Sequence, residues 1–196
     1  MKQISQGKFS FKVFSFFAVM SLLTGCQATS TAVAAAAQGL HAILKGINAS
    51  DEKEAHTIVF LTRHAEKRAD QGKNPDLTEE GSKAAQRLAT LLSEVDVDVI
   101  YSTPFKRTVQ TATPTAKEKD VPVTQLMLNA QEMALKIRAL HEGESVLVAG
   151  HSNTTPALLT QLGVEKPIVI EHNQYGDLFV VVLKKGELQH FSVLKY

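Results

Sequence analysis

The sequence predicts an α/β domain in which a mostly parallel sheet is flanked by helices in three layers and ends in an antiparallel C-terminal edge. Short β-branched runs alternate along the chain with segments of helical periodicity. Two further β runs near the C-terminus surround the turn-forming residues 184–187, which is a hairpin signal. The length of 196 residues, with 44% hydrophobic and 21% charged residues, is typical of a protein with one sizeable core.

The predicted strands are short runs of β-branched and aliphatic residues. The first covers 57–62 and ends at charged residues, and the second covers 97–101 and ends at a Ser-Thr-Pro sequence. The third is the apolar run 145–150, and the hairpin strands cover 177–183 and 188–194. Because helices alternate with the first three strands, we expect those strands to be parallel.

Four helices are predicted between these strands. Thr78 has the residue type of an N-cap, and Glu79 and Glu80 place negative charge at the positive end of the helix dipole. Pro104 is predicted in the first turn of the second helix, and Thr155-Pro156 opens a fourth through Leu162. Apolar residues at helical spacing mark the buried faces of the first and third helices: Ala84, Ala85, Leu88, Leu91 and Leu92, then Met133, Ile137 and Leu140.

The charge balance and the cysteine content limit the partners of the chain. With 21 Lys and Arg against 20 Asp and Glu, the protein is not strongly basic, so we expect no nucleic-acid partner. No apolar run reaches the roughly 18–20 residues that a membrane span needs. Cys26 is the only cysteine, so no intramolecular disulfide can form.

The N-terminus has the pattern of an export signal, because Lys2, Lys8 and Lys12 precede a short, mostly apolar stretch over 13–23. This stretch ends in Leu23-Thr24-Gly25-Cys26, which resembles the lipobox of bacterial lipoproteins, where the cysteine is lipidated and becomes the new N-terminus. The alternative interpretation is a buried hydrophobic hairpin with an incidental cysteine. The resemblance implies a lipoprotein signal peptide over 1–25 and a lipid anchor on Cys26.

The segment 26–54 combines an Ala/Thr-rich stretch with a polar run and is predicted to be a tether, in which 33–44 has the pattern of a short helix. The folded domain is then expected over 55–196. The implied location is an extracytoplasmic one, lipid-anchored at the cell envelope. In a cell with two membranes, Gln27 resembles the sorting pattern for the outer membrane and its periplasmic face.

Basic and imidazole side chains follow each of the first three predicted strands. Ligand sites in open α/β sheets gather at the carboxyl ends of strands, so we expect these side chains to meet at one edge. Two guanidinium forks beside two imidazoles would bind a tetrahedral phosphoryl group, and a neutral imidazole is a competent nucleophile toward phosphorus. The candidate residues are Arg63, His64 and Glu66 after the first strand, Arg107 after the second, and His151, Ser152 and Asn153 after the third.

Three motifs carry a resemblance to a known family. Leu61-Thr62-Arg63-His64-Ala65-Glu66-Lys67 resembles the Arg-His signature of the histidine phosphatase superfamily, in its phosphoglycerate mutase-like branch. Tyr101-Ser102-Thr103-Pro104 with Arg107 is similar to its second arginine motif, and Val148-Ala149-Gly150-His151-Ser152 to its second histidine motif. Their order and spacing match along essentially the whole domain, which implies a phosphoglycerate mutase-like fold.

The resemblance implies a role for each site residue. His64 would be the nucleophile that becomes phosphohistidine, and Arg63, Arg107 and His151 would bind the phosphoryl oxygens, with Ser152 and Asn153 assisting. Glu132 falls in the interval where mutase-like members have their proton donor, while Glu118 is a poorer candidate. Glu66 is the alternative donor, or it orients His64. No metal and no cofactor are expected.

These roles imply a metal-independent phosphomonoester hydrolase whose substrate is a phosphorylated small molecule or a phosphoprotein. A bell-shaped pH profile is expected, because the nucleophile must be neutral while the donor is protonated. Two alternatives remain open: a phosphoglycerate mutase-like isomerase and a non-catalytic lipoprotein that binds phosphorylated ligands. Residues 173–177 are interpreted as either pocket lining or a plain loop. The other histidines are interpreted as surface or structural residues: His41, His56, His141, His172 and His190.

Overall fold

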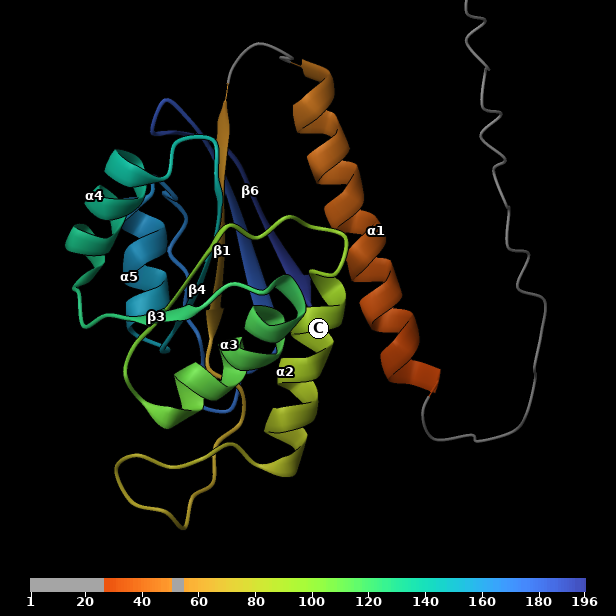
Figure 1. Ribbon diagram of the computed structural model, residues 1–196, viewed down its shortest axis with the longest axis vertical. Coiled ribbons are helices and arrows are strands. Elements are labelled where there is room, and N and C mark those ends of the chain that lie inside the picture. Colours follow the sequence, from red (N-terminus) through yellow and green to blue (C-terminus); the bar gives the residue numbers. More distant parts are fainter. Residues whose placement is uncertain (1–26, 51–54) are drawn as a thin grey trace, which may run out of the picture.

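The structure is a computed structural model that describes residues 27–50 and 55–196. One six-stranded sheet is flanked by five helices (Figure 1). The strands are β1 (His56–Arg63), β2 (Val99–Ser102), β3 (Val123–Gln125), β4 (Ser145–Gly150), β5 (Asp177–Lys184) and β6 (Glu187–Lys195). The helices are α1 (Gln27–Ser50), α2 (Glu79–Leu91), α3 (Lys106–Lys119), α4 (Ala130–Leu140) and α5 (Thr154–Gln161).

The sheet has the order β3-β2-β4-β1-β5-β6. The first four strands in that order are parallel to one another, whereas β5 is antiparallel to β1 and β6 is antiparallel to β5. The predicted α/β fold with a mostly parallel sheet and an antiparallel C-terminal edge is therefore confirmed. This topology puts the carboxyl ends of β1, β2 and β4 side by side, where the predicted site residues follow.

The core is divided between the two faces of the sheet, as a three-layer architecture requires. Alternate residues of β1 point to opposite faces: Phe60 packs in the cluster with α1, α2 and α3, whereas Val59 and Leu61 pack in the cluster with α4 and α5. Figure 1 shows α4 and α5 on the side of the sheet opposite α1. The central strands are fully covered, so the site they present is fixed to a rigid base.

Local sequence signals explain most element boundaries. Thr78 caps α2 as predicted, since its hydroxyl accepts the N–H of Gly81 at 2.9 Å. Pro104 was predicted in the first turn of α3, but this prediction is wrong by two residues. The helix begins at Lys106, and Phe105 is its N-cap. Leu140, at 61% exposure, is not part of the buried face of α4. The three-residue β3 was too short to give a period and was not predicted.

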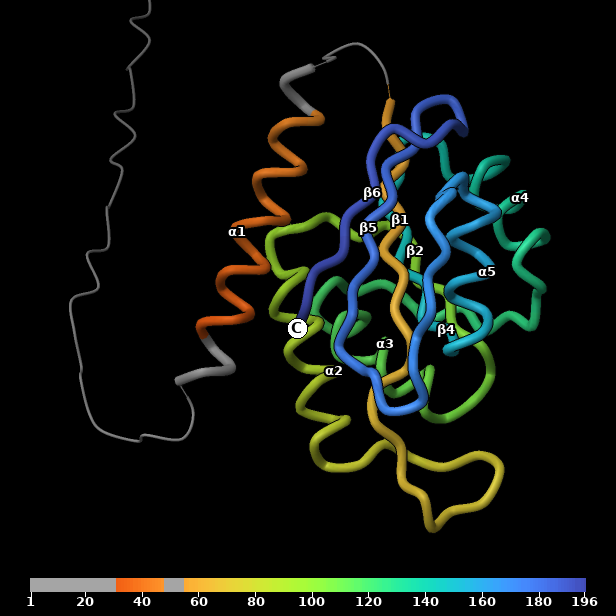
Figure 2. Tube along the Cα trace, turned by 180° about the vertical axis from the view of Figure 1, so that it is seen from behind, coloured from red at the N-terminus to blue at the C-terminus, as the bar shows by residue number. Residues whose placement is uncertain are grey.

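The segment expected to be a tether, 26–54, is largely helix α1. Val33, Ala36 and Leu40 recur at helical spacing and are buried in the core cluster of α2 and α3. Figures 1 and 2 show α1 running along the outside of the domain beside α2 and β6. The apolar stripe stabilises this helix by burial, and the helix extends beyond the short one expected over 33–44.

Replacing Leu40 with alanine is expected to lower the free energy of unfolding by about 2–4 kcal/mol, because the side chain is 2% exposed in the core. His41→Ala, on the exposed side of the same helix, is the matched control and should change it by less than about 0.5 kcal/mol. Urea denaturation measures both. Equal effects of the two variants would mean that α1 does not pack on the domain in solution.

Cys26 and the predicted signal peptide lie outside the described residues. Over the two described stretches, 27–50 and 55–196, the helices are all too short or too polar to cross a membrane.

Candidate active site

The carboxyl ends of β1 and β4 bring the two histidines of the predicted motifs together. Arg63 is paired in register with Gly150, and the N–H of His64 donates to the Gly150 carbonyl at 2.9 Å. The ring centroids of His64 and His151 lie 5.5 Å apart in an edge-on arrangement. Residues 87 positions apart in the sequence therefore form one site, as the strand-end argument predicts.

The hydrogen bonds of His64 fix which of its ring nitrogens can attack. Nδ1 lies 2.8 Å from the carbonyl oxygen of Ala65, which can only accept, so Nδ1 carries the proton. Nε2 of the neutral ring therefore holds the lone pair. The N–H of Ala65 donates to the Thr111 hydroxyl at 2.9 Å, and that hydroxyl donates to the Arg107 carbonyl at 2.7 Å. These two hydrogen bonds join the end of β1, where His64 lies, to the first turns of α3.

His151 is oriented through its Nε2 atom, whereas His64 is oriented through Nδ1. Nε2 lies 2.9 Å from the hydroxyl of Thr103, which lies 2.8 Å from the hydroxyl of Thr108. The backbone N–H of His151 donates to the hydroxyl of Thr154 at 2.9 Å, at the start of α5. A threonine pair at the end of β2 thus sets the orientation of the imidazole that follows β4.

Arg63 is 5% exposed and is held at the base of the site. Its Nη1 donates to the backbone carbonyls of Glu171 (2.8 Å) and Gln174 (2.9 Å), in the loop before β5. Its guanidinium carbon lies 4.3 Å from the centre of the Tyr175 ring. Of the two interpretations of the loop 173–177, pocket lining is the one that fits Gln174 and Tyr175.

Arg107, in the first turn of α3, presents the second guanidinium. Its carbon lies 4.5 Å from the centre of the Phe105 ring, and Nη1 has one long bond of 3.5 Å to the carbonyl of Lys73. Burial and the charge of Arg63 lower the pKa of Arg107 from its ordinary value. The Nε atoms of Arg63 and Arg107 are both buried and have no hydrogen-bond partner. Among the described residues, these two buried N–H groups are therefore donors without an acceptor.

Both imidazoles are held neutral. Burial is the main cause that lowers the pKa of His64 to about 3. The hydrogen bond to the Ala65 carbonyl raises this pKa, and the nearby Arg63, His151 and Arg107 lower it further. Burial, then Arg107 and Arg63, lowers the pKa of His151 to about 4. The neutral form of His64 is the one that can attack phosphorus, and it is present over the whole physiological range.

These low pKa values predict acid-dependent stability. Histidines of the unfolded chain titrate near 6.5, so between that pH and about 3 to 4 the unfolded state binds more protons than the folded state. The free energy of unfolding is therefore complete above about pH 6.5 and falls as the pH drops toward about 4. Urea titrations at several pH values measure the decline, which should be shallower for His64→Asn. An equally steep decline in that variant would contradict the prediction.

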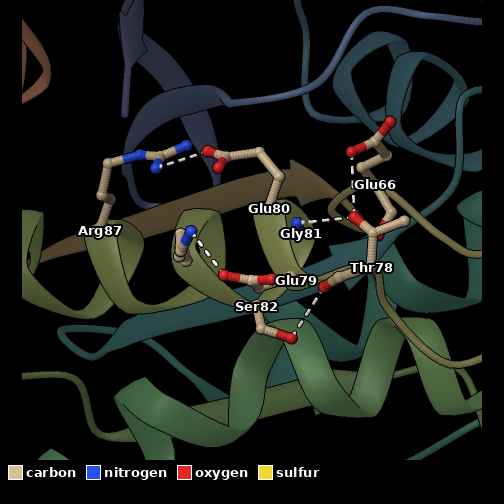
Figure 3. Close-up of polar contacts among 8 residues, drawn as sticks. Glu66, Thr78, Glu79, Glu80, Gly81, Ser82 and Arg87 are labelled. Atoms are coloured by element: carbon tan, nitrogen blue, oxygen red, sulfur yellow. Dashed lines mark hydrogen bonds and ion pairs between the residues drawn. The ribbon is translucent and has the colours of Figure 1, made fainter. Parts of the chain in front are cut away.

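Glu66 lies two residues after His64 and is exposed. Its carboxylate accepts the hydroxyl of Thr78 at 2.9 Å, while the same hydroxyl accepts the N–H of Gly81 (Figure 3). A Cβ at Gly81 would lie 2.1 Å from the carbonyl oxygen of Glu66, so glycine is required there for α2 to approach. Glu66 is thereby fixed beside the N-terminus of α2, and within the described residues its second carboxylate oxygen has no hydrogen-bond partner.

The structure gives Glu132 a different partner. It is the N3 residue of α4, and its carboxylate accepts the N–H of Asn129 at 2.8 Å while its own N–H donates to the Asn129 side chain. This capping box uses the carboxylate to stabilise the helix end. Glu118 lies in the last turn of α3, about 16 Å along the helix axis from Arg107. Helix capping, rather than a contact with either imidazole, is the interaction that the structure shows for the Glu132 carboxylate.

The remaining predicted residues are placed as follows. Ser152 is half-buried after β4, and Asn153 is exposed at the N-cap of α5, where its side chain makes no capping bond. His141 is structural, since its buried ring lies between Tyr101 (2.9 Å) and Glu144 (2.7 Å). Thr103 lies in the second arginine motif and Phe105 lies between that motif's Pro104 and Arg107, but neither residue was predicted to have a role. Their contacts are to a distant histidine and to a neighbouring arginine, which no local pattern predicts.

Comparisons with known proteins agree with this geometry. Residues 59–128 match the family model of the histidine phosphatase superfamily (branch 1), a range that includes Arg63, His64 and Arg107. The chain is 45% identical over 71 residues to phosphoserine phosphatase 1 of Hydrogenobacter thermophilus, which is 33% of this chain and 34% of that protein. The chain thus matches about a third of the length of this curated relative.

Solved structures share the fold over most of the domain. The protein histidine phosphatase SixA complexed with tungstate matches with a TM-score of 0.62 at 23% identity, covering 70% of this chain and 96% of that chain. A phosphoglycerate mutase from Bacillus anthracis matches with a TM-score of 0.53 at 16% identity, covering 74% and 95%. The fold is therefore phosphoglycerate mutase-like, and residues 59–128 are similar to the model of the histidine phosphatase superfamily.

Proposed function

We propose that this protein is a metal-independent phosphomonoester hydrolase that acts through a phosphohistidine on Nε2 of His64. The observation that carries the proposal is the pair of buried Nε–H groups, on Arg63 and Arg107, that have no protein partner beside a neutral imidazole. Buried donors are normally satisfied, so two such donors at one site favour an anionic ligand. A phosphoryl group matches the positive charge of these two guanidiniums, both of which act electrostatically on His64.

The reaction has two balanced steps. In the first, the lone pair of His64 Nε2 attacks phosphorus, the P–N bond forms, the ester P–O bond breaks, and the leaving oxygen takes a proton from an acid. In the second, water attacks phosphorus, the P–N bond breaks with its electrons returning to Nε2, and the proton of water goes back to that acid. Arg63, Arg107 and His151 stabilise the charge that develops on the phosphoryl oxygens.

Glu66 is the acid of this proposal. Its carboxylate has only a neutral hydroxyl partner, whereas that of Glu132 is engaged in a helix cap. Glu66→Gln should slow the hydrolysis of an alkyl phosphate far more than that of p-nitrophenyl phosphate, because nitrophenolate leaves without protonation. Glu132→Gln is the matched control. Equal losses on both substrates would remove Glu66 from the role of acid.

Hydrolysis is favoured over phosphoryl transfer within the substrate. Between α3 and β4 the chain forms only the three-residue β3 and the 11-residue α4, which leaves little to enclose a small sugar acid. Incubation with labelled 3-phosphoglycerate distinguishes the two outcomes. Free phosphate supports the hydrolase, 2-phosphoglycerate supports an isomerase, and binding without either product supports a non-catalytic phospho-ligand protein.

The substrate of the proposal is a phosphorylated small molecule or a phosphoprotein. The curated relative is named a phosphoserine phosphatase, and one structural neighbour is described as a protein histidine phosphatase. A panel of phosphomonoesters together with phosphohistidine- and phosphoserine-containing proteins, assayed for released phosphate, separates these classes by their kcat/KM values.

We also propose that the protein is held at the cell envelope by a lipid on Cys26, with its domain outside the cytoplasm. The support is the basic start, the apolar stretch and the lipobox-like residues that end at Cys26. Labelling of growing cells with a radioactive fatty acid should mark the wild-type chain and leave Cys26→Ser unmarked. Equal labelling of both chains, or of neither, would contradict the anchor.

A further inference from the structure

The two guanidiniums of the site lack the partner that usually orients an arginine. Among the described residues, neither Arg63 nor Arg107 forms an ion pair with a carboxylate. Arg107 has a single long bond, of 3.5 Å, to a backbone carbonyl, and both Nε–H groups are without partners. Arg63 is held by two backbone carbonyls through Nη1, whereas the plane of Arg107 needs some other contact, because a free arginine side chain samples many rotamers.

An aromatic ring lies against each guanidinium. The ring of Tyr175 lies 4.3 Å from the Arg63 carbon and 6.1 Å from the His64 ring. The ring of Phe105 lies 4.5 Å from the Arg107 carbon and 5.4 Å from the His151 ring, at an interplanar angle of 82°. The site is therefore built of two similar units, each composed of one guanidinium, one aromatic ring and one imidazole.

We propose that Phe105 and Tyr175 are positioning residues, which orient Arg107 and Arg63 by stacking so that their free N–H groups meet the phosphoryl oxygens. The inference rests on the proposed function, since it concerns how the anion site of that reaction is kept in order. Phe105 reaches Arg107 from the N-cap position of α3, and Tyr175 reaches Arg63 from the loop that Arg63 itself bonds.

The physical reason lies in the charge of the site. A carboxylate partner would orient a guanidinium but would also neutralise it and compete with the substrate for its N–H groups. The face of an aromatic ring attracts the cation without adding a negative charge and leaves the edge of the guanidinium, with its donors, unoccupied. Stacking therefore keeps both the positive potential and the donors available for phosphate.

The test compares the binding of orthovanadate to the full chain and its variants. Phe105→Leu and Tyr175→Leu keep an apolar side chain but remove the ring, and each should raise the Kd for vanadate and lower kcat/KM for an aryl phosphate about tenfold. Phe105→Tyr and Tyr175→Phe restore a ring and are expected to recover most of that loss. Leu135→Ala, exposed on α4, is the control for an unrelated apolar truncation.

A double-mutant cycle separates positioning from general structural support. If Phe105 acts through Arg107, then Phe105→Leu should cause no further loss of vanadate affinity in an Arg107→Ala background, whereas independent roles give additive losses. Leu variants that bind vanadate within twofold of the wild type, or an additive cycle, would overturn this inference alone. A wild-type protein that binds no vanadate and hydrolyses no phosphomonoester would overturn the proposed function and the inference with it.

Discussion

His64→Ala is expected to lower the hydrolysis of an aryl phosphate by about 10³-fold or more, because in the proposed mechanism it removes the atom that attacks phosphorus. The fold should persist, since the backbone bond from residue 64 to Gly150 and the Ala65–Thr111 bond do not involve the imidazole. The side chain is also held neutral, so its loss leaves no buried charge unpaired. The measurement is the steady-state rate of phosphate release, together with the thermal unfolding midpoint.

The matched control is His190→Ala, which removes an exposed imidazole from β6 and should leave the rate unchanged. Turnover by His64→Ala close to that of the wild type would exclude His64 as the nucleophile. Loss of turnover together with loss of the thermal transition would show that the histidine is needed for folding, and His64→Asn, which retains a polar side chain, would then replace it in the assay.

Arg63→Lys is expected to lower kcat/KM by roughly 10²-fold, although the charge is conserved. An ammonium group has no planar fork, so it cannot donate to both the Glu171 and Gln174 carbonyls, stack on Tyr175 and offer an N–H to the phosphoryl group. The loop before β5 should loosen as well, because Arg63 joins it to the end of β1. Limited proteolysis of that loop measures this second effect.

The comparison for this variant is Arg138→Lys. Arg138 also donates to a backbone carbonyl, that of Gly186, but it is exposed and lies outside the site. The Arg138→Lys variant should hydrolyse the substrate at the wild-type rate. A kcat/KM for Arg63→Lys within a few-fold of the wild type would mean that charge alone, without the planar geometry, satisfies the phosphoryl group.

Much of the fold follows from periodicity and turn chemistry. The runs that became β1 and β4 have no polar interruption, and the structure buries both faces of each strand. The N-cap at Thr78 and the turn at residues 184–187 were likewise readable from residue type. Helix α1 was predicted only in part, as a short helix over 33–44, because its packing against α2 and β6 is not revealed by an Ala-rich sequence.

The site residues, too, could be predicted from the sequence only in part. Arg63, His64, Arg107 and His151 were predicted because each directly follows a strand or opens the helix after one, and the topology of the sheet then brings those ends together. Glu132 shows the limit of such reasoning, since its interval in the sequence fits a proton donor while its carboxylate caps a helix. The stacking of Tyr175 on Arg63 joins positions 112 residues apart, and no local pattern specifies it.

The central claim is that one phosphoryl group is transferred to Nε2 of His64 between the two guanidiniums. Rapid quenching of the protein with a labelled phosphomonoester, followed by peptide mapping under alkaline conditions, tests it directly. The account predicts an acid-labile, alkali-stable phosphoramidate on the peptide that contains His64, formed as fast as the alcohol is released. Steady release of phosphate with no label on that peptide, or with label on another residue, would contradict it.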